Sequence, residues 1–415
     1  MEYTDYVDEG YSPDDSELVC RYHIEPHEDA EFRRVAGGVA AESSVGTWDP
    51  DLKTMTEGVE DLAATVFELD AEANEISVAY TTEVFEPSSL PQLLSSITGN
   101  IFGLEEIRHL RLEDVDFPKE FVRSFEGPEL GVEEIKSRVG ADDRPLCGTI
   151  VKPKLGLRSD EHAEVAYEAW VGGLDLVKDD ENLTDMEFNP FYERVEETLE
   201  RKREAETETG DSKLYFPNIT APVSEMKRRA DAVVENGGSY VMIDILTAGW
   251  SALQEMREYL DDGIGIHAHR AQHAAYTRLP YHGISMLSVA KFARLAGIDN
   301  LHAGTVLGKM ESDADEIKEI YDFLRSDWYG TENVIPVASG GLHPGVVSGV
   351  VEVLGTDTVV QAGGGVHAHP GGTRSGARAL RDAVDAVAEG VTVDEKAEES
   401  EELAQALDRW GKQKT

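Results

Sequence analysis

Short apolar, β-branched runs alternate with amphipathic stretches in a regular rhythm from residue 145 to residue 365. Each run is followed by apolar residues at helical spacing, as in SDEHAEVAYEAWVGG at 159–173. Eight such strand–helix units over about 250 residues predict a parallel (β/α)8 TIM barrel, whereas the alternative, an open doubly wound sheet, rarely needs eight. The predicted strands lie within residues 145–154, 174–181, 213–220, 239–246, 263–270, 300–306, 334–341 and 358–365.

A different pattern precedes the barrel. Strand-like runs at 18–26, 61–70, 75–82 and 107–118 interleave with helical stretches at 29–41 and 90–103, which predicts a small α+β, ferredoxin-like fold. Acidic residues near the start indicate an extended arm, and Glu-rich residues near the end indicate a solvated helical tail. We expect four parts: an acidic arm at 1–15, an α+β domain at 16–135, the barrel at 136–392 and an acidic tail at 393–415.

The net charge is strongly negative, because 82 Asp and Glu stand against 38 Lys and Arg, a formal charge of −44. The excess runs through the whole chain, so the surface repels nucleic acid and anionic membranes and suits a very salty cytoplasm. Cys20 and Cys147 lie far apart without metal-type spacing, which favours a reducing compartment. Since no signal-type stretch or run of 18 apolar residues occurs, we expect a cytoplasmic protein that does not span a membrane.

The segment GGLDLVKDDEN at 172–182 predicts a metal site at the end of the second barrel strand. Side chains alternate along a strand, so Lys178 and Asp180 point one way, Asp179 points the other way, and Glu181 joins the first two if the chain turns. Two carboxylates suit Mg²⁺, but an ammonium beside them would repel it. Reaction of Lys178 with CO2 would remove that charge and supply a carbamate as a third anionic ligand. The alternative is a surface cluster of salt bridges.

Polar residues and glycines also end the other barrel strands, and in this fold the carboxyl ends of the strands converge on one rim. Glycine-rich turns after the seventh and eighth strands let backbone N–H groups approach a phosphate, and the next helix N-termini favour its charge. Arg270 and His302 can bind a second phosphate, so we expect a substrate phosphorylated at both ends. The rim residues are Lys152, Lys154, Lys178, Asp180, Glu181, His267, His269, Arg270, His273, His302, Lys309, Ser339, Gly340, Gly341, Gly363, Gly364 and Gly365.

His267 and His269 are spaced like the metal-binding pair of hydrolases that use a carbamylated lysine. Here the pair falls on the fifth strand, the lysine precedes DDE on the second, and the eighth strand ends in glycines without an aspartate, all of which disfavour a hydrolase. Proton transfer or phosphate binding at the rim suits His269 better. His267 lies one pleat deeper, so a hydrogen-bonded core role and a catalytic role both remain open for it.

Eight motifs follow one another along the chain: AAESSVGTW (40–48), SSITGNIFG (95–103), KPKLGL (152–157), GGLDLVKDDEN (172–182), HAHRAQHAA (267–275), HAGTVLGKME (302–311), VASGGLHP (337–344) and QAGGGVHAHPGG (361–372). Over nearly its whole length the chain therefore resembles the large subunit of ribulose-1,5-bisphosphate carboxylase/oxygenase (RuBisCO). That family has a small amino-terminal α/β domain before a (β/α)8 barrel. The segment TIVKPK and the short carboxyl end resemble archaeal form III members, and the acidic surface suits a halophilic archaeon.

The resemblance implies that CO2 and water convert ribulose 1,5-bisphosphate to two molecules of 3-phosphoglycerate, with oxygenation by O2 as a side reaction. Lys178, carbamylated by an activating CO2, would bind Mg²⁺ with Asp180 and Glu181, and the carbamate or a neighbour would remove the C3 proton of the substrate. His269 would shuttle protons. Lys309, on a closing loop, would polarise the second CO2, and Lys152 would protonate the last carbanion.

Substrate contacts and assembly are implied in the same way. Arg270, His302 and Ser339 resemble the residues that hold one phosphate. Glu42 and its neighbours in the amino-terminal domain reach the site of a partner subunit in this family, so a dimer is the minimum, rings of dimers are open, and a small subunit is not expected. The other implied contacts are Lys154 beside Lys152, Thr47, Trp48 and Asn100 in the amino-terminal domain, and Gly340, Gly341, Gln361, Gly363 and Gly364 on the barrel.

Departures from the family pattern are few. Ile150 stands where plant-type enzymes have threonine, and Thr149 beside it is a candidate replacement. In form III the substrate is thought to come from nucleotide (AMP) salvage. One alternative is a RuBisCO-like enolase or isomerase of another phosphosugar, which typically lacks some of these lysines or phosphate-binding residues. A non-catalytic phosphosugar-binding protein, the other alternative, would not need Lys309 or the metal group.

Overall fold

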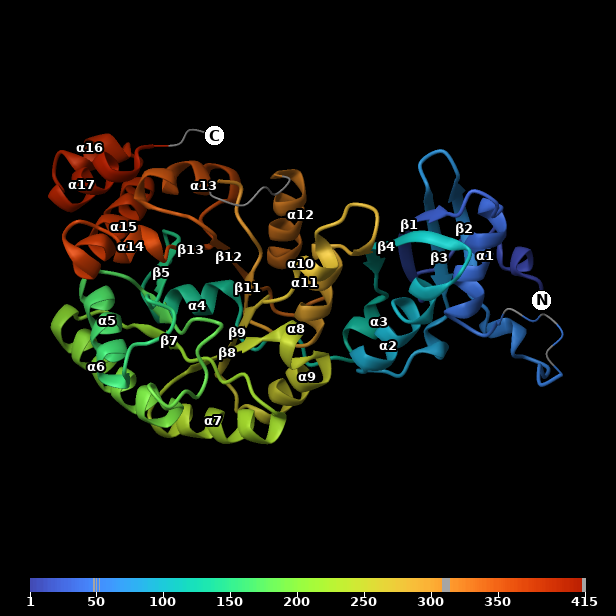
Figure 1. Cartoon of the computed structure of the whole chain (residues 1–415), viewed down its shortest axis with the longest axis horizontal. Coiled ribbons are helices and arrows are strands. Elements are labelled where there is room, and N and C mark those ends of the chain that lie inside the picture. Colours follow the sequence, from blue (N-terminus) through green and yellow to red (C-terminus); the bar gives the residue numbers. More distant parts are fainter. Residues whose placement is uncertain (48, 50, 52, 308–313, 413–415) are drawn as a thin grey trace. The chain divides into compact units, whose positions relative to one another are not determined.

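The computed structural model describes residues 1–47, 49, 51, 53–307 and 314–412. These residues group into two compact units, which Figure 1 shows as ribbons. One unit contains Met1–Glu126 and Gln272–Ala296, and the other contains Gly127–Ala271 and Gly297–Thr415. The chain therefore leaves the second unit after Ala271 and returns to it at Gly297.

The first unit is built on a sheet whose four long strands are antiparallel. β1 (Leu18–Pro26) pairs with β3 (Glu75–Tyr80) and with β4 (Ile107–Asp116), and β2 (Thr65–Asp70) pairs with the other side of β3. Two helices, α1 (Phe32–Glu42) and α2 (Leu90–Ile97), separate the strands in sequence. The chain order β1-α1-β2-β3-α2-β4 and the sheet order β4-β1-β3-β2 confirm the ferredoxin-like prediction.

Three further segments belong to this unit. β10 (Gly283–Ile284) pairs in parallel with β4 and lies in sequence between α10 (Ala274–Thr277) and α11 (Met286–Leu295), while α3 (Lys119–Val122) follows β4. The first residues do not form the expected extended arm. Tyr3–Tyr6 is a 3-10 helix that packs on α1, because its two tyrosine rings are buried there.

The second unit contains the predicted TIM barrel. Its sheet order is β7-β6-β5-β13-β12-β11-β9-β8, and all neighbouring strands are parallel. The two end strands meet where Met242 N donates to Pro217 O at 2.8 Å and Ile219 N donates to Met242 O at 3.0 Å, so the sheet closes on itself. In the described part of the chain the eight strands fall within the eight predicted runs: β5 (Leu146–Ile150), β6 (Leu176–Lys178), β7 (Leu214–Phe216), β8 (Tyr240–Asp244), β9 (Gly265–His269), β11 (Asn300–His302), β12 (Ile335–Ser339) and β13 (Val359–Gln361).

Helices follow the strands along the chain, as the alternating pattern predicts. One helix, α4 (Val132–Arg138), precedes the first strand, and its Ile135 packs in one apolar cluster with the early strand residues Leu146, Leu214 and Ile335. The amino end of the barrel is thus apolar, which leaves the carboxyl end for polar groups. The other barrel-unit helices are α5 (Ser159–Val171), α6 (Phe191–Thr209), α7 (Val223–Glu235), α8 (Ile245–Ala248), α9 (Trp250–Tyr259), α12 (Ala314–Arg325), α13 (Val347–Leu354), α14 (Gly364–His367) and α15 (Gly372–Glu389).

The carboxyl-terminal residues do not form a solvated appendage. α16 (Val393–Ala397) and α17 (Glu401–Trp410) both pack against α15. Leu403 and Ala406, three residues apart on one face of α17, are fully buried, whereas Glu401, Asp408 and Arg409 of the same helix are exposed. None of the helices in the described ranges combines the length and the apolar composition that crossing a bilayer requires.

Candidate active site

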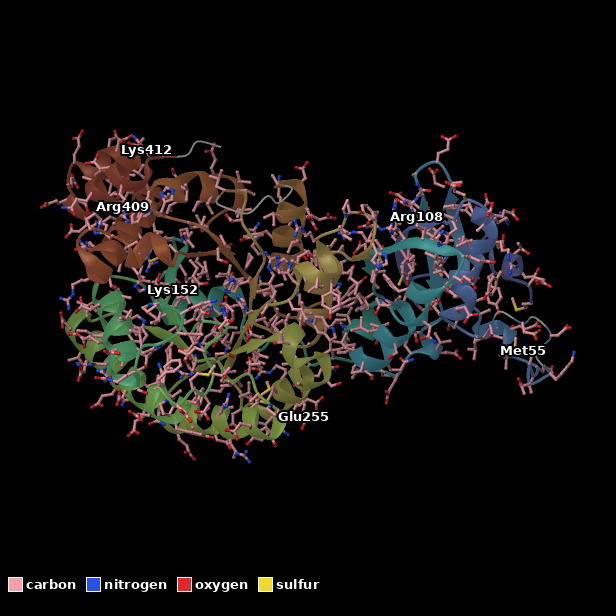
Figure 2. The ribbon with its side chains drawn as sticks, viewed as in Figure 1. Met55, Arg108, Lys152, Glu255, Arg409 and Lys412 are labelled. Atoms are coloured by element: carbon pink, nitrogen blue, oxygen red, sulfur yellow. The ribbon has the colours of Figure 1, made fainter. Side chains whose placement is uncertain are left out.

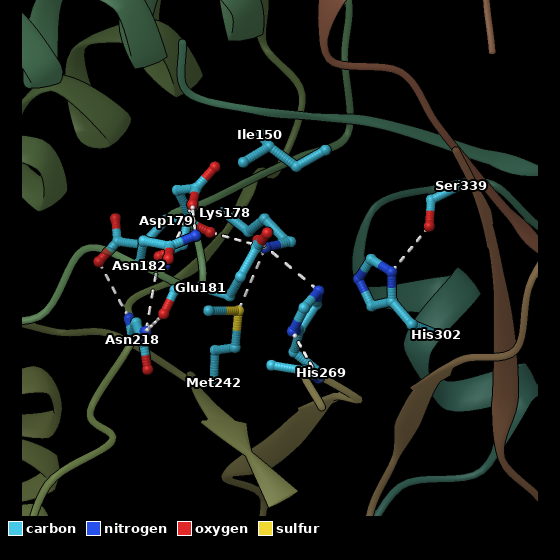
Figure 3. A network of polar contacts seen from close by, with 12 residues as sticks. Ile150, Lys178, Asp179, Glu181, Asn182, Asn218, Met242, His269, His302 and Ser339 are labelled. Atoms are coloured by element: carbon cyan, nitrogen blue, oxygen red, sulfur yellow. Dashed lines mark hydrogen bonds and ion pairs between the residues drawn. The ribbon is translucent and has the colours of Figure 1, made fainter. Parts of the chain in front are cut away.

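Lys178 ends β6 inside the barrel, and its side chain is fully buried. Its ammonium donates to the carbonyl of Asp179 at 2.7 Å and lies 3.4 Å from the sulfur of Met242 on β8. Glu181 Oε2 is 3.7 Å from Lys178 Nζ (Figure 3). Burial lowers the pKa of Lys178, although the nearby carboxylates oppose that shift. The amine is therefore easier to deprotonate than an exposed lysine.

Asp180 contacts the first barrel strand as well as its own loop. Lys152, which follows β5 and is labelled in Figure 2, lies with Nζ 2.5 Å from Asp180 Oδ2. Asn182 donates to the other oxygen, Oδ1, through its backbone N–H at 3.1 Å and its amide at 3.0 Å. Burial would raise the pKa of Asp180, but the hydrogen bonds from Lys152 and Asn182 lower it overall. The carboxylate is thus held ionised at the barrel mouth.

Asp179 faces the opposite side of β6, as strand alternation predicts. Its carboxylate accepts hydrogen bonds from Arg194 Nε at 3.1 Å, from the Tyr215 hydroxyl at 2.6 Å and from the backbone N–H of Asn218 at 3.0 Å. His162 Nε2 lies 3.1 Å away. Burial would raise the pKa of Asp179, but the Arg194 charge and these hydrogen bonds hold it well below its usual range. Asp179 therefore anchors β6 to the surrounding helices.

His269 ends β9 and is oriented by a residue that the sequence reasoning missed. Its Nδ1 lies 2.9 Å from Asp244 Oδ1 at the end of β8, and its Nε2 lies 3.6 Å from Glu181 Oε2. Asn218, after β7, donates from its amide to the Glu181 carbonyl at 3.2 Å. Asp244 ends β8 and Asn218 comes two residues after β7, so the strand-end rule that found His269 would also have found these two residues.

His302 and Ser339 lie together on neighbouring strands, with His302 Nδ1 2.8 Å from the Ser339 hydroxyl oxygen (Figure 3). His302 Nε2 is 3.0 Å from His267 Nε2. Burial lowers the pKa of both histidines well below the usual value, and neighbouring positive charges add to the shift, so both rings are neutral at pH 7. His267 is fully buried and stacks on Phe216, which favours a core role over contact with substrate.

Arg270 follows directly after His269. Burial lowers the pKa of Arg270 to about 10, so its guanidinium stays charged at neutral pH. A Cβ added at Gly304 would lie 3.0 Å from Arg270 Nη2, and Gly304 has a φ of +100°. Because Gly304 has no side chain, the guanidinium of Arg270 has space beside it.

The glycine turns after β12 and β13 also depend on glycine. Gly340 and Gly341 have φ of 116° and 80°, which side-chain-bearing residues rarely adopt, and a Cβ at Gly363 would lie 3.3 Å from Lys152 Cε. The segments that follow are short: a 3-10 helix at Pro344–Val346 and α14 of four residues. Backbone N–H groups of the turns, rather than long helix dipoles, are what these loops offer an anion. Gln361, on β13, is buried, and neither polar atom of its amide has a hydrogen-bond partner among the described residues.

The oxygen groups at the end of β6 fit a hard divalent cation. Asp180 and Glu181 supply two carboxylates on the same side as Lys178, and a carbamate on that buried amine would supply a third oxygen ligand. Among the described residues, no group of three or more His, Cys, Asp or Glu side chains is arranged to hold a metal ion.

Several predicted site residues are not grouped with these. Trp48 and Lys309 lie outside the described residues. Glu42, Thr47 and Asn100 belong to the first unit. Two more predicted rim residues are also not grouped with the residues around Lys178. Lys154 is exposed, and His273 belongs to the first unit.

Thr149 does not take the place of the threonine missing at Ile150. Its hydroxyl donates to the carbonyl of Ala362 at 2.7 Å and lies 3.0 Å from His367 Nε2. Adjacent residues of a strand face opposite sides, so Thr149 points away from the side of β5 that carries Ile150. The mouth of the barrel keeps an apolar side chain at this position.

Comparison with known proteins decides the family. The family model "Ribulose bisphosphate carboxylase large chain, catalytic domain" matches residues 131–410, and "Ribulose bisphosphate carboxylase large chain, N-terminal domain" matches residues 5–121. The chain belongs to the RuBisCO large-chain family. The resemblance found in the sequence, including an enzyme of archaeal type, is thereby confirmed.

Curated RuBisCO relatives match over almost the full chain. The "Ribulose bisphosphate carboxylase" of Pyrococcus abyssi (strain GE5 / Orsay) is 50% identical over 412 residues, which is 99% of this chain and 97% of the relative. That of Methanosarcina barkeri (strain Fusaro / DSM 804) is 48% identical and covers 98% of this chain and 99% of the relative.

Solved RuBisCO structures match as well. The octameric RuBisCO of Pyrococcus horikoshii OT3, in complex with sulfate ion, has a TM-score of 0.96 and 49% identity, covering 99% of this chain and 97% of that chain. The dimeric archaeal RuBisCO of Hyperthermus butylicus has a TM-score of 0.93 and 42% identity, covering 99% of this chain and all of that one. The two-part fold described above is therefore that of RuBisCO.

Proposed function

We propose that this chain carboxylates ribulose 1,5-bisphosphate with CO2 and water to give two molecules of 3-phosphoglycerate, with oxygenation by O2 as a side reaction. One observation carries the proposal: a fully buried lysine, Lys178, lies beside two ionised carboxylates at the mouth of a RuBisCO barrel. Neither a structural protein nor a simple phosphosugar-binding protein needs that combination, because a buried amine without a reaction partner costs stability.

Activation follows from the state of Lys178. A neutral amine attacks CO2 and an ammonium does not, so the lowered pKa of Lys178 favours carbamate formation. Asp180, Glu181 and the carbamate would then hold Mg²⁺. When bound, the metal supplies Lewis-acid polarisation of substrate oxygens and stabilises negative charge that develops on them.

Proton transfers fall to the chain's own residues. Asp244 fixes His269 through Nδ1, which leaves Nε2 on the side of Glu181 to take or give a proton at the reacting carbons. Lys152 lies at the same mouth with an ammonium that can protonate the carbanion left by C–C cleavage. Lys309 would reach the reacting CO2 from its loop, as the resemblance implies.

The two phosphates would bind on opposite sides of these residues. Arg270, His302 and Ser339 form one group, of which Arg270 supplies the positive charge. The other group would consist of Gln361 at the end of β13 and the turn residues Gly340, Gly341, Gly363 and Gly364, where Lys152 lies against Gly363. Thr47, Trp48, Asn100 and Lys154 complete the proposed substrate contacts.

The proposed assembly is a homodimer or a ring of dimers without a small subunit, in which Glu42 reaches the site of the partner. The related structures support a homo-oligomer, since one is octameric and another is dimeric. For the source of substrate we propose nucleotide (AMP) salvage, as the resemblance to archaeal form III members implies.

Incubation with Mg²⁺, bicarbonate, labelled CO2 and ribulose 1,5-bisphosphate in concentrated KCl tests the activity. Labelled 3-phosphoglycerate is the expected product, and it should disappear when Mg²⁺ is chelated before substrate is added. Binding of the bisphosphate without labelled product would overturn the proposal in favour of a binding protein. Conversion of the substrate to an isomer would overturn it in favour of an enolase or isomerase.

A further inference from the structure

The amino-terminal 3-10 helix holds a carboxylate at the end of α1. The hydroxyl of Tyr3 donates to Glu42 Oε1 at 2.7 Å, and Glu42 is the last residue of α1. No other hydrogen bond or ion pair of Glu42 is found within the described ranges. Tyr3 itself is buried, with 7% of its surface exposed. The bond is therefore made by a fixed donor to a side chain that is otherwise unrestrained.

The surface of α1 is shaped to receive Tyr3. A Cβ at Gly37 would lie 1.9 Å from the Tyr3 carbonyl oxygen, and a Cβ at Gly38 would lie 3.1 Å from the Tyr3 ring. The guanidinium of Arg34, one turn earlier, lies over the same ring, 5.0 Å from its centre. Gly37 and Gly38 thus leave space for Tyr3, and Arg34 packs on its ring. These three contacts hold Tyr3 in one place on α1.

Glu42 needs a donor at this position. The carbonyl end of a helix carries partial negative charge, so a carboxylate there is disfavoured, and the net charge of −44 adds repulsion. A hydroxyl that donates to Oε1 offsets part of this repulsion and limits the side chain to few rotamers. It leaves Oε2 to meet another group.

The same 3-10 helix also borders the loop that carries Thr47. A Cβ at Gly46 would lie 2.5 Å from the Tyr6 hydroxyl oxygen and 2.7 Å from Ala41 Cβ. The Gly46 N–H donates to the Ala41 carbonyl at 2.9 Å. The first six residues therefore contact Glu42 and also Gly46, which directly precedes Thr47, one of the residues to which the proposed function assigns substrate contacts.

We propose that Tyr3 is a positioning residue that fixes the Glu42 carboxylate in the orientation it needs in the active site of a partner subunit. This inference rests on the proposed function, because that function is what places Glu42 at a reacting centre. Tyr3 does not touch substrate. It acts through the hydrogen bond to Glu42.

A conservative substitution tests the bond. Tyr3→Phe keeps the buried ring and removes only the donor, and we expect kcat/KM for carboxylation to fall about tenfold, as for loss of a hydrogen bond to a charged group. Tyr11→Phe is the matched control, because the Tyr11 hydroxyl donates to Glu17 at the same distance of 2.7 Å in the same terminal segment. This control should keep the activity of the unaltered enzyme.

A double-mutant cycle separates positioning from a general structural effect. In a Glu42→Ala background, Tyr3→Phe should cause no further loss, because its acceptor is gone. Where turnover of Glu42→Ala is too slow to measure, the cycle is run on the dissociation rate of a labelled six-carbon carboxylated bisphosphate that mimics the reaction intermediate. Both measurements are made in concentrated KCl on the full chain.

Two outcomes would overturn the inference while the proposed function stands: full activity of Tyr3→Phe, or equal losses from Tyr3→Phe with and without Glu42. Absence of labelled product from the unaltered enzyme would overturn the proposed function and the role of Tyr3 together. Unequal losses confined to the background with Glu42 support the inference.

Discussion

Lys178 and Asp179 are neighbours in the chain, but their side chains lie on opposite sides of β6. Lys178 points into the barrel toward Met242 and Glu181, whereas Asp179 points outward to Arg194 and its network. Because successive side chains of a strand point to opposite faces, Lys178 faces the proposed metal site and Asp179 faces the surrounding helices. Changes to the two residues should therefore have different effects, one on turnover and one on stability.

Replacing Lys178 tests the proposed activation directly. Lys178→Ala should abolish carboxylation and leave the fold intact, because the Asp179 anchor of β6 is untouched. Lys213→Ala is the matched control, since Lys213 is also a buried lysine, directly precedes β7 at the amino end of the barrel and pairs with Asp211 at 3.5 Å. Labelled product and circular dichroism are measured for both. Turnover by Lys178→Ala would contradict the assignment of the carbamate.

The pH dependence of activation follows from the pKa of Lys178, which burial lowers. Only the neutral amine reacts with CO2, and its fraction rises with pH, so activation at fixed dissolved CO2 should rise with pH. Its midpoint should lie below the ordinary lysine value of about 10.4. The rate of activation is followed by sampling enzyme into a short carboxylation assay. A midpoint at or above the ordinary value would contradict the effect of burial.

Asp244 should matter to turnover although no sequence motif marks it. Asp244→Asn keeps the shape but removes the charge that orients His269, so kcat should fall about 100-fold, as for loss of a well-placed proton carrier. Asp231→Asn is the control, because Asp231 accepts a 2.8 Å hydrogen bond from Tyr259 on the outside of the barrel. Steady-state kinetics of the two variants test this, and equal kcat values would show that turnover does not depend on the contact between Asp244 and His269.

Asp179 should stabilise the fold in a pH-dependent way. Because its pKa is depressed in the folded state, its contribution is complete above the unfolded value of about 3.9 and is lost as the pH falls below it. Asp179→Asn should cost about 3 kcal/mol at pH 7, and the difference from the unaltered chain should shrink under acid. Chemical denaturation across pH measures this. Asp160→Asn, on an exposed pair with Arg158, should show little change.

Salt should stabilise the whole chain. The formal charge of −44 produces self-repulsion that salt screens, so the free energy of unfolding should rise between about 0.3 M and about 3 M KCl. Thermal melts at several KCl concentrations are sufficient. Equal melting temperatures throughout would show that the acidic surface is not an adaptation to salt.

Much of the fold could be predicted from periodicity alone. The predicted runs at 174–181 and 334–341 contain β6 and β12, and the alternation of Lys178 with Asp179 was right, because strand geometry fixes it locally. Packing between segments that are distant in the sequence leaves no periodic pattern in that sequence, so it could not be predicted in this way. The burial of Tyr3 on α1 and of Leu403 on α15 depends on surfaces far away in sequence, so both terminal segments looked exposed.

In the candidate site, too, some residues could be predicted from the sequence and others only from the folded structure. Family motifs indicated Lys152, Asp180 and His269, but the orienting role of Asp244 appears only when β8 and β9 lie side by side. Thr149 looked like a replacement for a missing threonine because it is adjacent to Ile150. Adjacency within a strand places the two on opposite faces, so that replacement was wrong for a reason that strand geometry could have supplied.

The edge strand β10 lies in sequence between the barrel strands β9 and β11, yet it belongs to the first unit, where it hydrogen-bonds to β4. Truncation after Glu126 would leave β4 without its neighbour Gly283–Ile284, and excising 272–296 would interrupt the path from β9 to β11. Neither unit can therefore be produced intact as one uninterrupted fragment.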